Sequence, residues 1–242
     1  MYRLLKQMIS IVTGTLNRVG MLPNLIANTV LSDERIELVL VDGGSSDGTI
    51  DYVKQLDHPQ IKLIEIGGRS SYPHFMNIGI RESTYDIVCQ WNDDVILCND
   101  WSEVIIELQS NHDFYLFNWK YGSFEEIKNQ DWLKGVDHTS GWCLCNVADS
   151  GGEIVMNYGL YKKKIFREIG MYNPEYQYYY ADGDMSYRAY SFGYKVKDLR
   201  HIKVCSLPTN KAAIPYPSDK QLYEKNISLY RQRILPESLQ YL

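Results

Sequence analysis

The chain has 242 residues, of which 45% are hydrophobic and 23% are charged. These fractions are typical of a soluble globular protein with a full core. Its 25 basic and 30 acidic residues give a formal net charge of −5, which argues against nucleic acid as a main partner, because phosphate backbones attract surplus cations. No apolar run approaches the roughly 20 residues of a membrane-spanning helix. The first residues also lack the apolar core and cleavage site of a signal peptide.

The five cysteines do not form the pattern of a disulfide framework, so we expect a reducing, cytoplasmic setting. Cys143 and Cys145 form a lone CxC without a second pair. We interpret this CxC as ordinary packing rather than as a zinc site. The 20 tyrosines are unusual; phenol rings suit sugar recognition, and they equally suit core packing.

The first half alternates short apolar runs with helix-like segments. Apolar residues at helical spacing predict helices at 22–31, with Pro23 in the first turn, and at 50–56, with Asp47 as its cap. This alternation predicts an α/β fold with a mostly parallel sheet flanked by helices. Runs rich in Ile, Val and aromatic residues predict the strands, at 8–13, 36–41, 61–66, 86–91 and 114–119.

The second half has a different character. Residues 120–160 are rich in Gly, Trp and polar residues and show no clear periodicity. Helical spacing predicts short helices at 161–170 and 185–193, and a strand is expected at 194–199. The tail from residue 207 has Pro208, Pro215 and Pro217, followed by a final amphipathic stretch. The simplest organisation is one domain with an irregular C-terminal extension.

Two adjacent carboxylates, Asp93 and Asp94, follow the strand predicted at 86–91. Like charges side by side repel each other. A bound Mg²⁺ or Mn²⁺ would remove the repulsion, because these ions prefer oxygen ligands and leave positions open for phosphate oxygens. The alternative is a solvated turn in which Asn92 and Asp93 cap the next segment.

Polar residues also end the first two predicted strands, and ligands of such sheets bind beyond the carboxyl ends of the strands. In VDGGSSDGT, the glycines allow a close backbone approach to a ligand, and Asp42 could accept a hydrogen bond from a base or a ribose. The alternative is a tight turn with a helix cap. Thr13 and Thr15 could line a nucleotide slot or bond to their own loop.

The third candidate lies in YYYADGDMSYRAYSFGYKV, residues 178–196. Asp182 follows three tyrosines and precedes a helix, so its propensity favours a helix N-cap. A carboxylate in an aromatic wall could instead act as a general base toward a sugar hydroxyl. Asp184 and Arg188 are four residues apart and could pair along the helix.

Taken together, these segments resemble an inverting glycosyltransferase of family 2 with the GT-A fold, from about residue 8 to residue 200. The resemblance implies a Rossmann-like domain at 1–206, with a nucleotide-binding half at 1–100 and an acceptor-binding half at 101–206, then an extension with a helical tail at 207–242. The matching segments are SIVTGTLNR, VDGGSSDGT, MNIGI, NDDV at the DxD position, NYGLYKKKIFREIGMYNPEY and ADGDMSYRAYSFGYKV.

The resemblance also implies roles for single residues. Asp94 would coordinate Mn²⁺ or Mg²⁺, and Asp93 would hold the ribose or assist at the metal. Asp182 would be the catalytic base, while Asp184 and Arg188 would brace its helix and loop. The nucleotide would be lined by Thr13, Thr15, Asp42 and Gly43.

The chain departs from the family pattern at three places. Gly43 stands where the family often has a second acidic residue, which weakens any expectation that the donor base is uracil. Ser71 stands where an arginine often reaches the nucleotide, with Arg69 as a possible substitute. A histidine that sometimes follows the last core strand would fall near Ser206; the nearest histidine is His201, and we expect no metal role for it.

The implied function is transfer of a sugar from a nucleoside-diphosphate sugar to a hydroxyl of a glycan or lipid-linked acceptor, as in polysaccharide biosynthesis. The alternatives are a non-catalytic nucleotide-sugar or glycan-binding protein and a nucleotidyltransferase. TGTLNRVGMLP lacks the basic Gly-rich loop typical of a nucleotidyltransferase.

Acceptor recognition is expected to involve residues 120–160 and the tail, with Trp142 and Tyr178–Tyr180 as candidate stacking surfaces. The tail places Ile227, Tyr230 and Ile234 on one side, with Lys225, Arg231 and Arg233 nearby. We expect it to pack on the domain; the other readings are pairing with a second copy and contact with the inner face of an anionic membrane.

Overall fold

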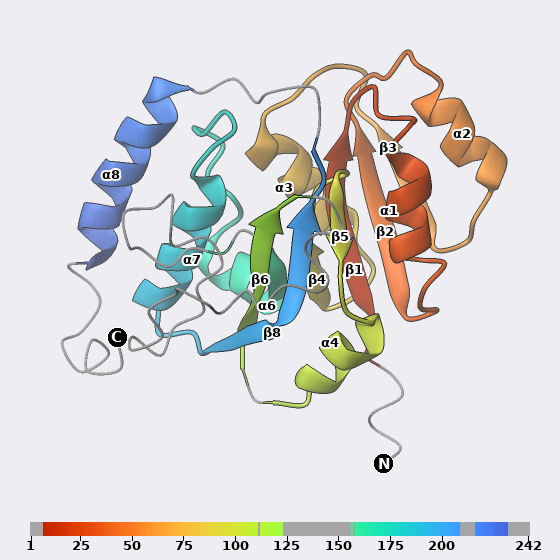
Figure 1. The fold of residues 1–242 in the computed structure, drawn as a ribbon. Helices are drawn as coiled ribbons and strands as arrows, with labels where there is room; N and C mark the ends of the chain where they lie inside the picture. Colours follow the sequence, from red (N-terminus) through yellow and green to blue (C-terminus); the bar gives the residue numbers. More distant parts are fainter. Residues whose placement is uncertain (1–6, 111, 123–155, 157, 209–215, 232–242) are drawn as a thin grey trace.

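A computed structural model describes residues 7–110, 112–122, 156, 158–208 and 216–231. It is an α/β domain in which helices cover a curled central sheet (Figure 1). The strands are β1 Ile9–Thr15, β2 Ile36–Asp42, β3 Ile61–Glu65, β4 Ile87–Gln90, β5 Val95–Leu97, β6 Phe114–Tyr121, β7 Gly159–Lys162 and β8 Val196–Ser206. The helices are α1 Leu22–Asn28, α2 Thr49–Leu56, α3 Tyr72–Glu82, α4 Trp101–Glu107, α6 Lys163–Ile169, α7 Ala181–Ser191 and α8 Pro217–Arg231.

The first half of the sheet is parallel, as the sequence predicted. The strands lie in the order β3-β2-β1-β4, and all three pairings are parallel. Strands β1 and β2 are almost entirely buried because helices cover the sheet. Their register places Thr15 opposite Asp42. The polar ends of both strands therefore meet at one edge.

Helix α3 packs unusually close to the sheet. A Cβ atom added at Gly79 would lie 2.3 Å from Cγ1 of Val12. Only glycine permits this approach, because no real Cβ contact is that short. The MNIGI segment thus packs the second half of α3 against the middle of β1.

The second half of the sheet is mixed, in keeping with the prediction of a mostly, rather than entirely, parallel sheet. Strand β7 runs antiparallel to both of its neighbours, β4 and β6. Strands β6 and β8 are parallel, and β5 pairs antiparallel with β8 at the edge.

Several element boundaries differ from the prediction. Tyr161 and Lys162 were expected in a helix, but they end β7, and α6 begins at Lys163. Tyr161 is fully buried and belongs to the pairing with β4. Helix α7 begins four residues before the predicted start at 185, and β8 continues to Ser206.

Strand β5 and helix α4 were not predicted. A three-residue strand is too short to show periodicity. Helix α4 did carry a signal, because Asp100 and Glu103 form a capping box and the buried Trp101 and Val104 are three residues apart.

The side chain of Asn28 covers the outer edge of β5. Its Nδ2 donates to the Leu97 carbonyl at 3.0 Å, and its Oδ1 accepts from the Leu97 amide at 2.7 Å. The Trp101 indole donates to the Asn28 carbonyl at 2.7 Å. The amide side chain thus stands where another strand would pair.

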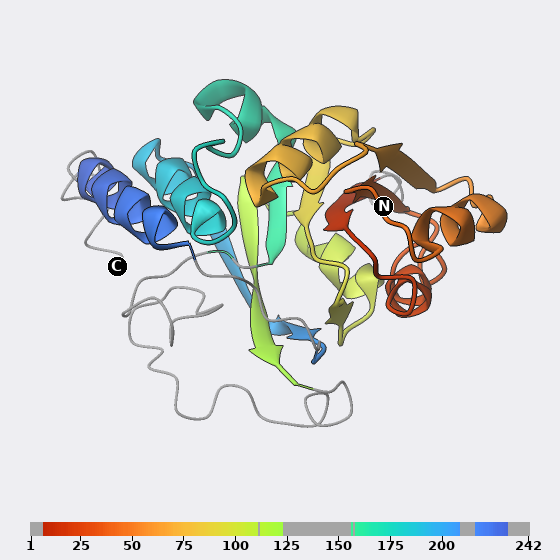
Figure 2. The ribbon, with the colours of Figure 1, turned by 90° about the horizontal axis from the view of Figure 1, so that it is seen from above.

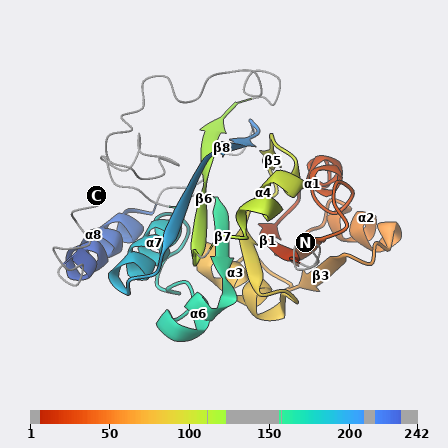
Figure 3. The ribbon, with the colours of Figure 1, turned by 90° about the horizontal axis from the view of Figure 1, so that it is seen from below.

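Helices α3 and α6 lie on one side of the sheet, and α1 and α4 lie on the other (Figures 2 and 3). Helices α7 and α8 lie side by side at the end of the second half. Tyr223 and Ile227 of α8 are buried, so this part of the tail packs on the domain, as expected. Among the described helices, none is both long and apolar enough to cross a bilayer.

Some sequence predictions lie outside the described residues. These are the Cys143–Cys145 pair, Trp142 and most of the stretch 120–160, together with Arg233 and Ile234 of the tail.

Candidate active site

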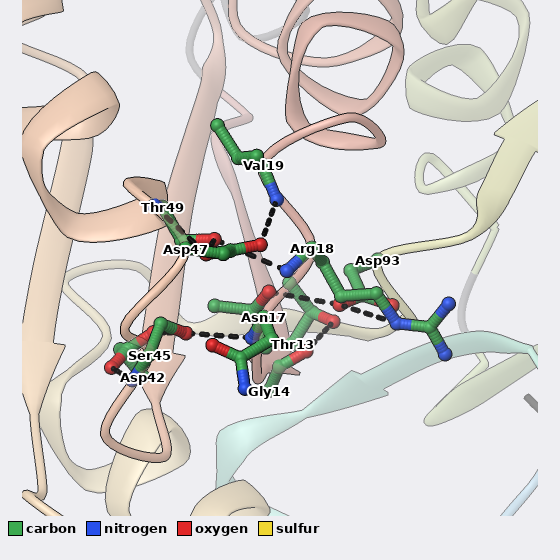
Figure 4. A network of polar contacts seen from close by, with 11 residues as sticks. Thr13, Gly14, Asn17, Arg18, Val19, Asp42, Ser45, Asp47, Thr49 and Asp93 are labelled. Atoms are coloured by element: carbon green, nitrogen blue, oxygen red, sulfur yellow. Dashed lines mark hydrogen bonds and ion pairs between the residues drawn. The ribbon is translucent and has the colours of Figure 1, made fainter.

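The loops after β1 and β2 are fastened to each other at the carboxyl edge of the sheet (Figure 4). The Gly43 amide donates to the Thr15 carbonyl at 2.9 Å. The Asn17 amide donates to Oγ of Ser45 at 2.8 Å, and Oδ1 of Asn17 accepts from the Ser46 amide at 2.8 Å. Most of these bonds involve backbone groups, so the edge is a preformed surface.

Asp47 joins the same two loops rather than capping α2 alone. One carboxylate oxygen accepts from the Val19 amide at 3.1 Å, and the other accepts from the Thr49 amide at 3.1 Å. The N-cap residue of α2 is Gly48, with φ of 94°. The predicted cap is therefore displaced by one residue, because the Asp47 carboxylate also serves the loop after β1.

Asp42 is fully buried, and its own turn occupies its carboxylate. Oδ1 accepts from the amides of Gly44 and Ser45 at 2.8 Å each, and Oδ2 accepts from the Ser45 hydroxyl. Gly44 has φ of 89°, which favours glycine at that position. Thr13 is also buried, and its hydroxyl donates to the Gly14 carbonyl at 3.2 Å. Nucleotide contacts of Asp42 and Thr13 stay predictions.

Asp93 lies beside the end of β1, as expected for converging strand ends. The Thr15 hydroxyl donates to Oδ2 of Asp93 at 2.9 Å, and the same oxygen lies 3.9 Å from Nε of Arg18 (Figure 4). Burial, reinforced by the charge of Asp94, raises the pKa of Asp93 to about 6. Burial also raises the pKa of Asp94.

The sequence argument did not assign Arg18. Its side chain approaches Asp93, and its charge lowers the pKa of both Asp93 and Asp94, opposing the effect of burial. The available signal was a basic residue in SIVTGTLNR, three positions after the end of β1. An arginine there can balance acidic groups or bind a phosphate.

The acidic pair fits a hard divalent cation. Asp93 and Asp94 offer carboxylate oxygens in a buried place where their negative charge is costly, and a cation would relieve that cost. Within the described ranges, no group of three or more His, Cys, Asp or Glu residues could hold a metal. The pair would thus supply only part of a coordination shell, with the remainder open to water or phosphate oxygens.

The end of β8 meets the acidic pair from the other side. The Leu207 amide donates to the Asp94 carbonyl at 2.8 Å. The Ser206 hydroxyl accepts from the Trp119 indole at 2.7 Å and lies 3.2 Å from the Tyr158 hydroxyl. His201 is exposed, and its Nε2 lies 3.2 Å from a carboxylate oxygen of Glu107 on α4.

Asp182 is the second residue of α7, and the helix N-cap is Tyr180 rather than Asp182. Tyr180 has φ of 67°, so the chain turns sharply before the helix begins. One Asp182 carboxylate oxygen accepts from the Gly183 amide at 2.8 Å. Burial raises the pKa of Asp182 to about 6, a value suited to exchanging a proton near neutral pH.

A wall of tyrosines surrounds Asp182. Burial raises the pKa values of these phenols, and the charge of Asp182 adds to the effect. The charge of Asp94 also raises the pKa of Tyr158, whose hydroxyl accepts from Asn92 Nδ2 at 3.0 Å. The charges of Asp94 and Asp182 thus both raise the pKa of this one phenol. The wall comprises Tyr72, Tyr158, Tyr161 and Tyr172.

The predicted pair between Asp184 and Arg188 is wrong. Asp184 is buried, and Oδ1 accepts from the Tyr176 hydroxyl at 3.1 Å and from Asn226 of α8 at 2.8 Å. Arg188 donates instead to the Met171 carbonyl. It also lines a cavity of about 400 Å³ between α3, α7 and the loop after α6, whose lining includes neither acidic residue of the strand end nor Asp182.

The structure places two of the residues at which the chain departs from the family pattern, Ser71 and Arg69. Ser71 caps α3 by accepting a hydrogen bond from the His74 amide at 3.4 Å. Its short neutral side chain does not supply the charge of the arginine that often reaches the nucleotide in the family. Arg69 is exposed, and a Cβ added at Gly43 would lie 3.7 Å from its Cα atom. Arg69 therefore lies at the nucleotide edge, and its contact with a nucleotide stays a prediction.

Comparison with solved structures supports the fold. The mannosyltransferase PcManGT from Pyrobaculum calidifontis, solved with GDP-Man and Mn²⁺, is 14% identical with a TM-score of 0.64, and the alignment covers 96% of this chain and 73% of that one. Residues 1–349 of TarS from S. aureus with UDP are 18% identical with a TM-score of 0.64, covering 96% and 70%. TarS 1–349 with UDP-GlcNAc is 16% identical with a TM-score of 0.62, covering 97% and 69%.

No curated protein matches the chain. The model of the family described as glycosyl transferase family 2 matches residues 10–170. That range contains both fastened loops, α3 and the acidic pair, and it ends before α7. The chain belongs to glycosyltransferase family 2 and has the GT-A fold of that family.

Proposed function

We propose that this protein transfers a sugar from a nucleoside-diphosphate sugar to a hydroxyl group of a glycan or lipid-linked saccharide, with inversion at the anomeric carbon. One observation carries the proposal. The charge of Asp94, after the end of β4, and the charge of Asp182, at the start of α7, both raise the pKa of Tyr158, so the two carboxylates lie within electrostatic reach of one phenol. A cation-binding carboxylate and a proton-accepting carboxylate thus border the same tyrosine wall.

Asp182 is the proposed general base. In the reaction, the bond between the anomeric carbon and the diphosphate oxygen breaks as an acceptor oxygen bonds to that carbon. The acceptor hydroxyl gives its proton to Asp182, and the diphosphate leaves with the bonding electron pair. Because the pKa of Asp182 is raised to about 6, the carboxylate is ionised at neutral pH and more basic than an ordinary aspartate.

Asp94 is the proposed ligand of Mn²⁺ or Mg²⁺, with Asp93 beside it. When bound, such an ion stabilises the negative charge that develops on a departing diphosphate. Asp93 is held by Thr15 and lies near Arg18, so it is oriented toward the loop after β1. The Arg18 guanidinium is a second cation available to phosphate oxygens.

The two fastened loops are the proposed nucleotide slot, lined by Thr13, Thr15, Asp42 and Gly43. The similar structures were solved with GDP-Man or with uridine nucleotides, so both donor classes belong in a test. Gly43 offers no acidic group to a base, which favours recognition through the ribose and the diphosphate. A cytoplasmic setting, including contact with a membrane that carries a lipid-linked acceptor, is part of the proposal.

The test is a donor panel: UDP-Glc, UDP-GlcNAc, UDP-Gal, GDP-Man and dTDP-Rha, each with Mn²⁺, with Mg²⁺ and with EDTA. Thermal shift identifies the donor that binds, because a ligand of the folded state raises the melting temperature. Release of nucleoside diphosphate with 4-nitrophenyl glycosides as acceptors then measures transfer, and proton NMR of the product reports the anomeric configuration.

Metal-dependent binding together with an inverted product supports the proposal. Binding of a sugar nucleotide without release of nucleoside diphosphate would instead favour a non-catalytic binding protein. Release of pyrophosphate from a nucleoside triphosphate and a sugar phosphate would favour a nucleotidyltransferase. A retained configuration would remove Asp182 from the proposed role.

A further inference from the structure

Asp219, on the first turn of α8, holds the backbone of a distant loop. Its side chain is completely buried. Oδ1 accepts from the Gln177 amide at 2.9 Å, and Oδ2 accepts from the Tyr178 amide at 2.8 Å and the Tyr179 amide at 3.0 Å. Three consecutive amides, some 40 residues earlier in the chain, thus converge on one carboxylate.

These bonds are the main support of that loop. Residues 177–180 belong to neither a helix nor a strand, so their amides cannot be satisfied by regular secondary structure. Asp219 forms no ion pair with any cationic side chain in the described part of the chain. Its negative charge is therefore balanced by the three amides, and bonds of this charged type are stronger than neutral ones.

Residues 177–180 connect to two parts of the candidate active site, the start of α3 and the start of α7. The Tyr72 amide, at the start of α3, donates to the Gln177 carbonyl at 2.9 Å. Tyr180 then turns the chain into α7, two residues before Asp182. A shift of residues 177–179 would therefore move both the tyrosine wall and the start of α7.

The loop also presents aromatic surface to solvent. The side chains of Tyr178 and Tyr179 are 40% and 38% exposed, and their rings are 5.1 Å apart at 81°. Burial, then the charge of Asp94 and to a smaller extent that of Asp93, raise the pKa of Tyr178, so its hydroxyl lies within electrostatic reach of the acidic pair. Exposed phenol faces beside acidic groups suit a pyranose ring, which has apolar C–H faces and polar edges.

We propose that Tyr178 and Tyr179 form a stacking platform for the sugar ring of the acceptor and that Asp219 is the positioning residue that sets this platform. The proposal rests on the proposed glycosyltransferase function. It makes α8, which lies beyond the family match, a functional part of the acceptor side.

The structure offers matched controls on the same helix. Glu224 is exposed, with its carboxylate 3.8 Å from Lys220, so Glu224→Gln removes a charge from α8 without touching the loop. Ile227 is buried in the core, so Ile227→Ala loosens the packing of α8 without touching the three amides. Tyr178→Phe keeps the aromatic face, while Tyr178→Ala removes it.

The experiment measures kcat and KM for a 4-nitrophenyl glycoside acceptor with the donor that the panel selects, and slow donor hydrolysis without acceptor. Asp219→Asn should raise the acceptor KM at least about tenfold, since an amide replaces a charged acceptor of three bonds. Donor KM and donor hydrolysis should stay within about twofold. Tyr178→Ala should show the same split, and Tyr178→Phe should raise the acceptor KM less than Tyr178→Ala does. Glu224→Gln and Ile227→Ala should keep the wild-type acceptor KM.

Amide hydrogen exchange supplies a readout that does not depend on turnover. In Asp219→Asn, exchange at residues 177–179 should accelerate at least about tenfold, and in Glu224→Gln it should not. An unchanged acceptor KM in Asp219→Asn, or a rise equal to that in Ile227→Ala, would overturn the proposal. A wild-type protein that hydrolyses and transfers no donor of the panel would instead overturn the proposed function, an outcome visible in the same assay.

Discussion

The proposed nucleotide side and the proposed acceptor side of the candidate site are built in different ways. On the nucleotide side, neighbouring loops after β1 and β2 are joined mostly through backbone amides. On the proposed acceptor side, the loop before α7 and helices α7 and α8 are joined through the side chains of Asp184 and Asp219. Substitutions on the acceptor side should therefore change activity or acceptor use while leaving donor binding intact.

The largest expected effect comes from Asp182→Asn. The amide has nearly the same shape but cannot take a proton, so kcat should fall by about 10² to 10⁴-fold. Donor affinity, measured by calorimetry with Mn²⁺, should match the wild type, because Asp182 lies on the acceptor side. Turnover close to the wild-type rate would exclude Asp182 as the base.

The reciprocal substitution is Asp94→Ala on the nucleotide side. Removing the proposed cation ligand should weaken donor binding in Mn²⁺ by about tenfold or more, as losses at metal sites commonly do. In EDTA the two proteins should bind the donor equally weakly. Equal donor affinity of both proteins in Mn²⁺ would show that Asp94 holds no ion there.

The pH dependence gives a smaller and graded effect. Asp182 acts as a base only when ionised, and its pKa is raised to about 6. With saturating Mn²⁺, kcat/KM should be level above about pH 7 and should fall about tenfold per pH unit below 6. A profile that stays level to pH 5 would contradict the raised pKa or the assigned role.

The smallest expected effect is one of stability. The pKa of Asp93 is about 6 when folded and near 3.8 when unfolded. Its cost to the folded state therefore builds up between about pH 4 and pH 6 and is fully present above pH 6. In EDTA at pH 7.5, Asp93→Asn should raise the free energy of unfolding by about 1–3 kcal/mol, and the gain should shrink toward pH 4.

Urea unfolding measures this stability effect, and Asp33→Asn is the matched control. Arg35 holds the pKa of Asp33 below its usual value, mainly through a side-chain hydrogen bond. This carboxylate therefore stabilises the fold above the unfolded pKa, and its removal should lower the free energy of unfolding at pH 7.5. The same direction of change in both variants would contradict the pKa argument for Asp93.

Sequence reasoning was most successful where structure is local. The strands at 36–41 and 61–66 carry apolar runs, and both exist in the structure. The position of Thr15 beside Asp93 also followed, because ends of parallel strands share an edge. Family resemblance, rather than periodicity, singled out Asp182.

The missed features depend on contacts between distant segments. In the sequence, Asp219 is an ordinary polar residue near a helix start. Only the structure shows that its carboxylate accepts hydrogen bonds from the amides of residues 177–179. Strand β7 was missed because Tyr161 precedes three lysines that suggest a helix. Arg188 was expected to pair with Asp184, yet the carbonyl of Met171 lies within its reach.

The amide side chain of Asn28 has a consequence for solubility. An exposed edge strand of a β-sheet can pair with a strand of another molecule, and such pairing causes aggregation. The Asn28 side chain forms hydrogen bonds with both the amide and the carbonyl of Leu97, so these groups of the edge strand β5 are not available to another strand. A protein with Asn28 replaced by leucine should retain its fold in dilute solution and aggregate sooner on concentration, as followed by light scattering.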